Sequence, residues 1–283
     1  MRETVICADS TCDLPDYIVE QRDIRITPLS ILLGEKSYLD GLEISPREIY
    51  DHVKETGELP KTAAVSPSIY YDLFKRLTDE GKDVVHIGLS SAISSSFQNA
   101  MVAASEFSNV YCVDSRNLCM GMGLLVLKAC DFRDAGMDAK RIAAKISKLV
   151  PKVSSTFVLD NLEYLHKGGR CSGVTRFGAN VLGIKPSIAV TAEGTLEVSK
   201  KYRGKTEAVY RQYANDRLAE VNRIDQSRIV IANSGNVSAD TIAFAKGLIA
   251  GKANFGEIIL AEAGCTISSH CGPGTFAIFY IKK

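Results

Sequence analysis

Apolar residues in the first half of the chain recur with two different periods. Thr4 to Ala8, Val84 to Leu89 and Val110 to Val113 are short apolar runs, and each ends at small polar residues. Such runs predict buried strands. Segments with helical spacing separate them, which favours βαβ units around a parallel sheet.

Helix boundaries are marked by capping residues. Ser45-Pro46-Arg47-Glu48 has the spacing of a capping box with proline at the first helical position, and Gly57 ends the predicted helix. Ser66-Pro67 begins another helix that ends near Gly81. Leu14 to Glu20, with Pro15 in its first turn, predicts a further short helix.

The pattern changes after Pro151. Predicted strands lie near Ser155 to Leu159, Pro186 to Thr191, Leu196 to Tyr202, Ile229 to Ala232, Glu257 to Ala261 and Thr275 to Ile281, and predicted helices at Thr206 to Val221 and Ala239 to Ala250. The turn Ala192-Glu193-Gly194 indicates a hairpin. We therefore predict an α/β fold with two lobes: residues 1–151 around a parallel sheet, and residues 152–283 around a mixed sheet.

Composition narrows the class of protein. Thirty-four basic and 33 acidic residues give a net charge of +1 without a long run of one sign, which disfavours nucleic acid as a partner. Asp9 interrupts the first apolar run too early for a secretion signal, and no apolar stretch approaches the ~20 residues of a transmembrane helix. The eight cysteines match no zinc spacing. We expect a cytoplasmic protein with reduced thiols and no metal.

A serine cluster, Ser90 to Ser96, follows the strand that ends at Leu89 and precedes a predicted helix from about Phe97 to Glu106. Open α/β sheets bind ligands at this position, and free N–H groups at a helix start favour an anion. No Lys or Arg lies between Val84 and Ala100, which suits a monoanion better than a triphosphate. Helix capping alone also explains serines here. Neither nucleotide-loop pattern occurs at a strand-to-helix junction, so ATP binding by this chain is not expected.

An alternative function is a serine esterase. Gly88-Leu89-Ser90-Ser91-Ala92 differs by one residue from the nucleophile elbow Gly-x-Ser-x-Gly, and His270 would be its base. Ala92 at the last glycine position and the lack of a glycine-rich oxyanion segment argue against it. His270 itself lies among small and turn-forming residues, where it either binds an anion or has a structural role.

Two other positions have side chains suited to an anion. Gly168-Gly169-Arg170 combines a flexible glycine pair with a guanidinium, which binds carboxylate or phosphate well, although an exposed loop arginine is the equally ordinary alternative. Thr62 lies in a loop after Pro60-Lys61, where its hydroxyl is free to face a ligand.

Together these segments resemble the DegV family, fatty-acid-binding proteins that serve as the lipid-carrying subunit of bacterial fatty acid kinase. The matching segments are Asp9 to Pro15, Thr62 with Ser66-Pro67, Ser90 to Ala100, Leu162 to Arg170, Gly183 to Pro186, and His270 to Gly274. They span the length of the chain. A regulatory protein without a ligand stays open as a third possibility, because family resemblance does not fix function.

The resemblance implies a site for one long-chain fatty acid. Its carboxylate would contact Thr62, Ser94 and His270, and its tail would fill an apolar tunnel between the lobes. Ser95 replaces the usual glycine of a Leu-Ser-Gly-Thr stretch, so it either narrows the approach of the carboxylate or shares the contact. Arg170 and Arg203 would assist phosphoryl delivery or docking.

The resemblance also implies partners. An ATP-dependent fatty acid kinase subunit would phosphorylate the bound carboxylate, and an acyltransferase of phospholipid synthesis would follow. The chain itself would be a carrier without cofactor or catalytic residues.

Overall fold

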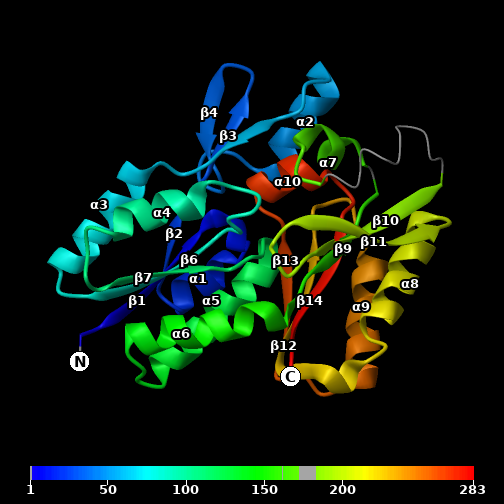
Figure 1. Cartoon of the computed structure of the whole chain (residues 1–283). Helices are drawn as coiled ribbons and strands as arrows, with labels where there is room; N and C mark the ends of the chain where they lie inside the picture. Colours follow the sequence, from blue (N-terminus) through cyan, green and yellow to red (C-terminus); the bar gives the residue numbers. More distant parts are fainter. Residues whose placement is uncertain (1, 161, 172–182) are drawn as a thin grey trace.

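The computed structural model describes residues 2–160, 162–171 and 183–283. A 4-stranded parallel sheet forms the core of the first lobe (Figure 1). In spatial order its strands are β2 (Ile24–Thr27), β1 (Thr4–Asp9), β6 (Asp83–Gly88) and β7 (Val110–Asp114). All six residues of β1 are buried, as expected for a strand covered on both faces. The parallel sheet predicted from the sequence is confirmed.

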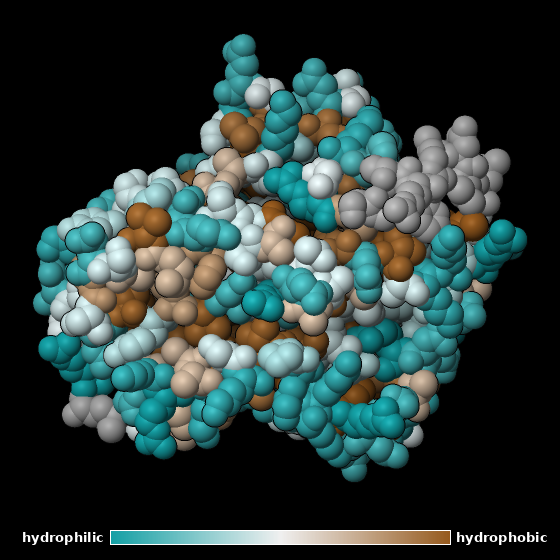
Figure 2. All heavy atoms as spheres, in the orientation of Figure 1, coloured by the Kyte–Doolittle hydropathy of each residue, from teal (hydrophilic) through white to brown (hydrophobic). Residues whose placement is uncertain are grey.

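Helices cover both faces of this sheet. α3 (Pro67–Asp79) and α4 (Ser96–Ala104) pack on one face, and α5 (Cys119–Asp134) and α6 (Ala139–Leu149) on the other (Figure 1). The short η1 (Ser10–Cys12) and α1 (Asp16–Gln21) connect β1 to β2. Most of the visible surface is hydrophilic, with several separate apolar patches, one of them over α3 and α4 (Figure 2).

A small antiparallel sheet, absent from the sequence prediction, lies above the first lobe. Its order is β4 (Lys36–Leu39), β3 (Ser30–Leu33) and β5 (Lys61–Ala63). α2 (Pro46–Thr56) lies beside it in Figure 1. The predicted capping box is present, with Ser45 and Glu48 bonded reciprocally and Gly57 in the left-handed conformation after the helix.

The second lobe contains a 7-stranded mixed sheet, as predicted. Its strands in spatial order are β11 (Leu196–Arg203), β10 (Ile184–Val190), β9 (Thr156–Val158), β14 (Phe276–Lys282), β12 (Ile224–Asn233) and β13 (Glu257–Glu262), with β8 (Val153–Ser154) beside β14. Only β12 and β13 run parallel among the described pairs of this sheet. The predicted hairpin joins β10 to β11.

The remaining helices border the second sheet. α8 (Thr206–Arg217) and α9 (Ala239–Lys252) cover its outer face in Figure 1. α7 (Glu163–Gly168) and α10 (Cys265–Cys271) pack against each other near the small sheet. The 3-10 turns η2 (Val150–Lys152) and η4 (Val221–Arg223) complete the described elements.

α5 lies between the two sheets and packs on both. It contacts β1 and β6 of the first lobe and β12 and β14 of the second. A Cβ at Gly121 would come 2.1 Å from Ser155 Oγ, and one at Gly123 would come 2.7 Å from the Cys12 carbonyl, so glycine allows close approach on each side. Residues 119–127 of the helix are all buried and uncharged, so this part of its sequence has no amphipathic period, and the charged residues lie in its C-terminal part. No helix in the described ranges is long and apolar enough to cross a membrane.

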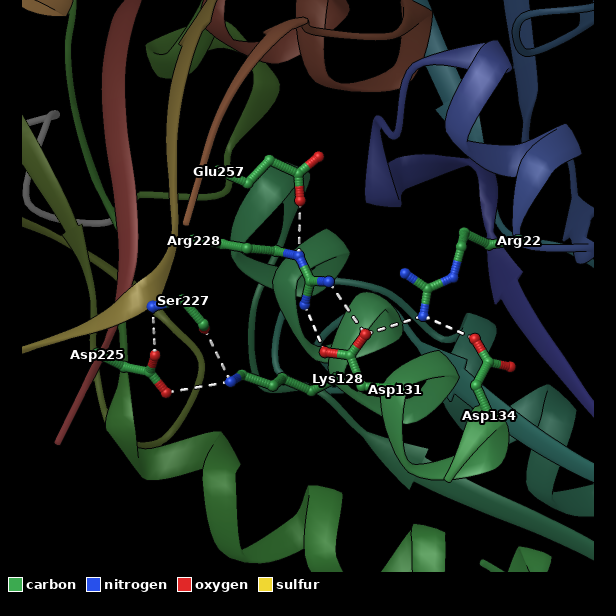
Figure 3. Close-up of polar contacts among 8 residues, drawn as sticks. All are labelled: Arg22, Lys128, Asp131, Asp134, Asp225, Ser227, Arg228 and Glu257. Atoms are coloured by element: carbon green, nitrogen blue, oxygen red, sulfur yellow. Dashed lines mark hydrogen bonds and ion pairs between the residues drawn. The ribbon is translucent and has the colours of Figure 1, made fainter. Parts of the chain in front are cut away.

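An ion-pair network also joins the lobes (Figure 3). Asp131 on α5 accepts hydrogen bonds from Arg22 after α1, at 2.8 Å, and from Arg228 on β12, at 2.5 Å. Burial opposes ionisation of Asp131, but the hydrogen bonds from the two arginines outweigh it and lower the pKa of its carboxyl. Lys128, one turn earlier, pairs with Asp225 at 3.1 Å.

Candidate functional site

A cavity of about 260 Å³ lies between the lobes. Most of its lining is apolar: Leu29, Ala64, Leu89, Ile93, Leu118, Phe157, Leu165, Leu196, Ile267 and Cys271. A narrower cavity of about 30 Å³ shares Leu118, Phe157, Ile267 and Cys271 with it. The two cavities are therefore neighbours, and together their apolar linings extend from the serine loop toward β12 and β14.

Six polar side chains form part of the wall of the larger cavity. They are Thr62, Ser94, Ser95, Arg170, Thr266 and His270. The structure thus brings together the four carboxylate-binding residues expected from the family resemblance, together with Arg170. A largely apolar cavity with polar side chains in its wall suits an amphipathic molecule with an anionic head.

Thr62 and His270 come from different lobes and meet directly. Thr62 Oγ1 lies 2.8 Å from His270 Nε2. Thr62 is in strand β5, opposite Ile31, and not in the loop predicted for it. His270 is in the last turn of helix α10 and not at the backbone bend predicted for it, and Gly272 is the cap that follows the helix. The backbone hydrogen bonds of β5 and α10 therefore fix the backbone positions from which the two side chains meet.

The imidazole of His270 is neutral near pH 7. Burial, reinforced by the positive charge of Arg170, lowers its pKa to about 4. When Nε2 carries the proton, it donates to Thr62 Oγ1, which leaves the threonine proton free to donate to an anion. Nδ1 has no partner among the described residues, and a Cβ at Gly168 would come within 2.5 Å of it. Only glycine fits beside the ring at that position.

The serine loop presents its hydroxyls through short local contacts. Ser94 Oγ accepts from the Ser96 N–H at 3.2 Å and lies 3.0 Å from Ser96 Oγ. Ser95 is exposed, with φ −81° and ψ −1°. Any L-residue adopts that conformation, so serine replaces the usual glycine here without backbone strain. Ser95 remains available as a second hydroxyl beside Ser94.

Asp9 supports this loop from beneath, a role that sequence reasoning missed. Its buried carboxylate accepts from the Leu89 N–H at 2.8 Å and from the Tyr70 hydroxyl at 2.5 Å, and His86 Nε2 lies 3.4 Å away. Burial and the Asp9 charge both raise the pKa of Tyr70, so that hydroxyl stays a donor. The position of Asp9 at the end of a strand was the only sequence signal for this role. Its partners could not be inferred, because they lie about 60 to 80 residues away in the chain.

Ser90 does not form the esterase arrangement considered from the sequence. Its side chain is buried, donates to the Gly194 carbonyl at 2.8 Å and accepts from the Ala92 N–H at 3.3 Å. Ser90 is absent from the described lining of the cavity that contains His270. The hydroxyl therefore fastens the β10–β11 hairpin to the first lobe, and no nucleophile–base pair exists between these residues.

The two predicted arginines differ in position. Arg170 lines the cavity, is exposed and donates to the Gly168 carbonyl at 2.6 Å. The preceding segment is helix α7 with Gly169 as its left-handed cap, and not a flexible glycine loop. Arg203 ends β11, whereas Leu196 at the start of that strand lines the cavity, which separates them by ~20 Å. The structure does not bring Arg203 into the described lining.

The described residues contain neither a cluster suited to a metal ion nor a reactive thiol in the wall of the larger cavity. No group of three or more His, Cys, Asp or Glu side chains is arranged to hold a metal ion there. The cysteine of the cavity wall, Cys271, has its pKa raised to about 12 by burial, which keeps the thiol protonated and unreactive.

These features define a two-lobed α/β protein with a largely apolar interlobe cavity and several polar side chains in its wall. The DegV family model, described as "uncharacterised protein, DegV family", matches residues 3–283. The chain therefore belongs to the DegV family, as the sequence resemblance indicated.

Relatives match over the whole chain. A DegV domain-containing protein of Clostridium acetobutylicum is 31% identical over 285 residues, with 100% of both chains covered. The solved fatty-acid-binding DegV family protein of Thermus thermophilus is 30% identical, with a TM-score of 0.88 and 100% of both chains covered. A stearic acid-binding protein of Eubacterium ventriosum is 25% identical, with a TM-score of 0.85, covering 100% of this chain and 99% of that one.

Proposed function

We propose that this protein binds one long-chain fatty acid, holds its tail in the interlobe cavity and presents its carboxylate to a partner kinase in the cytoplasm. Thr62, Ser94 and His270 hold the carboxylate, and Ser95 supplies a further hydroxyl. The observation that carries the proposal is the largely apolar interlobe cavity with these neutral polar groups in its wall, next to a second, narrower apolar cavity. The fatty-acid-binding descriptions of two solved relatives support it.

The tail and the head of the ligand contribute differently. Each buried CH₂ stabilises binding by ~0.8 kcal/mol, whereas each neutral hydrogen bond to the head contributes ~1 kcal/mol net. The tail therefore supplies most of the affinity, and the head contacts supply orientation. A carboxylate held by neutral hydroxyls, with the neutral imidazole of His270 orienting the Thr62 hydroxyl, keeps its own negative charge and stays nucleophilic.

Native mass spectrometry of the purified protein tests the lipid. We expect a non-covalent adduct with the mass of a long-chain fatty acid, which organic extraction removes. A protein that carries no such adduct and fails to bind added palmitate would contradict the proposal.

A coupled assay with an ATP-dependent fatty acid kinase tests presentation of the carboxylate. We propose that the kinase transfers phosphate from ATP to give an acyl phosphate for an acyltransferase of phospholipid synthesis, while this chain supplies no catalytic residue. Thr62→Ala and Ser94→Ala should reduce phosphorylation more than lipid retention, because positioning governs reactive geometry. Equal loss of both would point to a simple binding defect.

Arg170 is the basic residue closest to phosphoryl delivery in this proposal, because it lines the cavity and is exposed. Arg203 serves as the matched control and tests a docking role away from the carboxylate. We expect Arg170→Gln to slow phosphorylation with lipid still bound. Arg203→Gln should change only the affinity for the kinase.

A further inference from the structure

A further cavity, of about 540 Å³, shares no described lining residue with the 260 Å³ interlobe cavity and only Ala263 with the narrower one. We call it the acidic groove and define it by the residues that line it: Ser10, Cys12 to Asp16, Val19, Ile26, Pro28, Asp40 to Leu42, Pro46, and Leu260 to Gly264. Strands β2 and β13, which contribute to it, are the edge strands of the two large sheets. The groove therefore lies where the edges of the two sheets come together.

The charge of the groove has one sign. Four of its described lining residues are acidic, namely Asp13, Asp16, Asp40 and Glu262, and none is Lys, Arg or His. The Asp40 carboxylate is satisfied, because it accepts from Ser10 and Thr266 hydroxyls at 2.7 Å and from the Cys265 N–H at 2.8 Å. Asp16 and Glu262 are exposed at its rim.

Asp13 is the exceptional member. Its residue is 7% exposed, and neither carboxylate oxygen has a hydrogen-bond partner of good geometry among the described residues. A buried charged group without a partner is costly, so such groups are normally paired. Burial and the nearby Asp40 charge raise the pKa of Asp13, although the Cys119 thiol and the Gly264 N–H oppose this. Both oxygens are covered from solvent, so a cationic group relieves both effects only if it enters the groove and displaces the atoms that cover them.

The walls of the groove are apolar. Leu42 is 72% exposed and Leu260 41% exposed, which is unusual for leucine side chains beside one cavity. Val19, Ile26 and three prolines complete the apolar surface. An aliphatic stem that ends in a cation matches this combination, because lysine and arginine bury their methylene groups while the charge meets an acid.

We propose that the acidic groove is a docking site for a basic segment of a partner protein, which inserts a lysine or arginine side chain toward the carboxylate of Asp13. The charge of the lining selects the cation, and the exposed Leu42 and Leu260 receive the flanking apolar residues of the segment. The site is independent of the proposed lipid function. It lies at the other end of α10, where Gly264 borders the groove and His270 borders the lipid cavity.

Side-chain analogues test the site on the full-length protein. n-Butylammonium and n-propylguanidinium imitate lysine and arginine, and n-butanol is the uncharged control. We expect saturable shifts of the amide NMR signals of Asp13, Leu42 and Gly264 with either cation and none with butanol. Asp13→Asn, which tolerates the left-handed φ of 49° at this position, should weaken binding about tenfold or more. Glu106→Gln, an exposed residue outside the groove, should change nothing.

A measurement of thermal stability and a measurement of peptide binding complete the test. Asp13→Asn should raise Tm, because it removes an unpaired buried carboxyl, and a short Val-Lys-Val peptide should bind more tightly than butylammonium. A lower Tm with unchanged cation binding would assign Asp13 a structural role. No shift at tens of millimolar cation, a response to Mg²⁺ or Ca²⁺ alone, or a peptide that binds no tighter than butylammonium would each overturn the proposal.

Discussion

The hydroxyl of Thr62 and the imidazole of His270 lie 2.8 Å apart although 208 positions separate them in the chain. Thr62 comes from the small sheet above the first lobe, and His270 comes from a helix of the second. This polar contact in the cavity wall exists only when the two lobes are packed together. Under the proposed function, binding of the fatty-acid carboxylate and interlobe packing therefore depend on the same contact.

Replacing Thr62 with valine keeps the shape of the side chain and removes its hydroxyl. We expect a fatty acid to bind ~5-fold to 10-fold more weakly, because about one net hydrogen bond to the head is lost. A fluorescent fatty acid displaced by palmitate measures this. Thr78→Val, which removes only a contact to the Lys75 carbonyl within α3, is the control, and an equal loss there would contradict the assignment.

The lowered pKa of His270 gives the delipidated protein a pH-dependent stability. The ring has an ordinary pKa of 6.5 when unfolded and about 4 when folded, so the unfolded state binds the proton more tightly. The folded state is therefore stabilised above pH 6.5 and loses that stability as the pH falls toward 4, by at most ~3 kcal/mol. Urea unfolding at several pH values measures it.

His270→Gln isolates this contribution from other titrating groups. The variant should lose less stability than the parent protein between pH 7 and pH 4.5. Identical pH dependence in the two proteins would mean that the imidazole is not desolvated in the folded state.

Much of the fold is predictable from the sequence because capping residues, turn residues and apolar runs mark the ends of most helices and strands. The helix between Ser45 and Gly57 carries both of its caps, and β10 and β11 flank a turn that ends in glycine. α5 was missed because its residues 119–127 are buried on every side, so no polar face marks the helical period there. The strands β3, β4 and β5 have three or four residues each, too few for a period to show.

The site was less accessible to local reasoning. The sequence around Ser90 resembles a nucleophile elbow, whereas the sequence around Ser94 resembles no catalytic motif. In the structure the Ser90 hydroxyl donates to the Gly194 carbonyl, 104 positions away. Thr62, Ser94 and His270 were reached through family resemblance, and their convergence depends on how two lobes pack. The role of Asp9 requires the position of Leu89, which no pattern around either residue indicates.

The Asp131 carboxylate should contribute more stability than its neighbour Asp134. Asp131→Asn leaves Arg22 and Arg228, whose side chains are 20% and 15% exposed, without their shared anion. We expect a loss of ~1–3 kcal/mol in the free energy of unfolding. Asp134 is 49% exposed, so Asp134→Asn should cost less than ~1 kcal/mol. Equal losses in urea titrations would contradict the difference.

Gly194 has two independent reasons to be glycine, and they can be separated. Its φ is +84°, and a Cβ would come 2.2 Å from Ser90 Oγ. Gly136 has a similar φ of +79° with nothing within 4 Å, so Gly136→Ala reports the conformational cost alone, ~1 kcal/mol. Gly194→Ala should lower Tm clearly more. Equal shifts would show that the hairpin moves away at little cost.

The position of α5 has a consequence for synthesis on the ribosome. Residues of the first lobe emerge first, yet one face of α5 is covered by β12 and β14, which are made much later. β14 lies between β9 and β12, so the middle of the second sheet is the part that is synthesised after its neighbours. We expect the nascent first lobe to expose a strip of apolar helix until that strand arrives, which makes this interval the one in which chaperones would be needed.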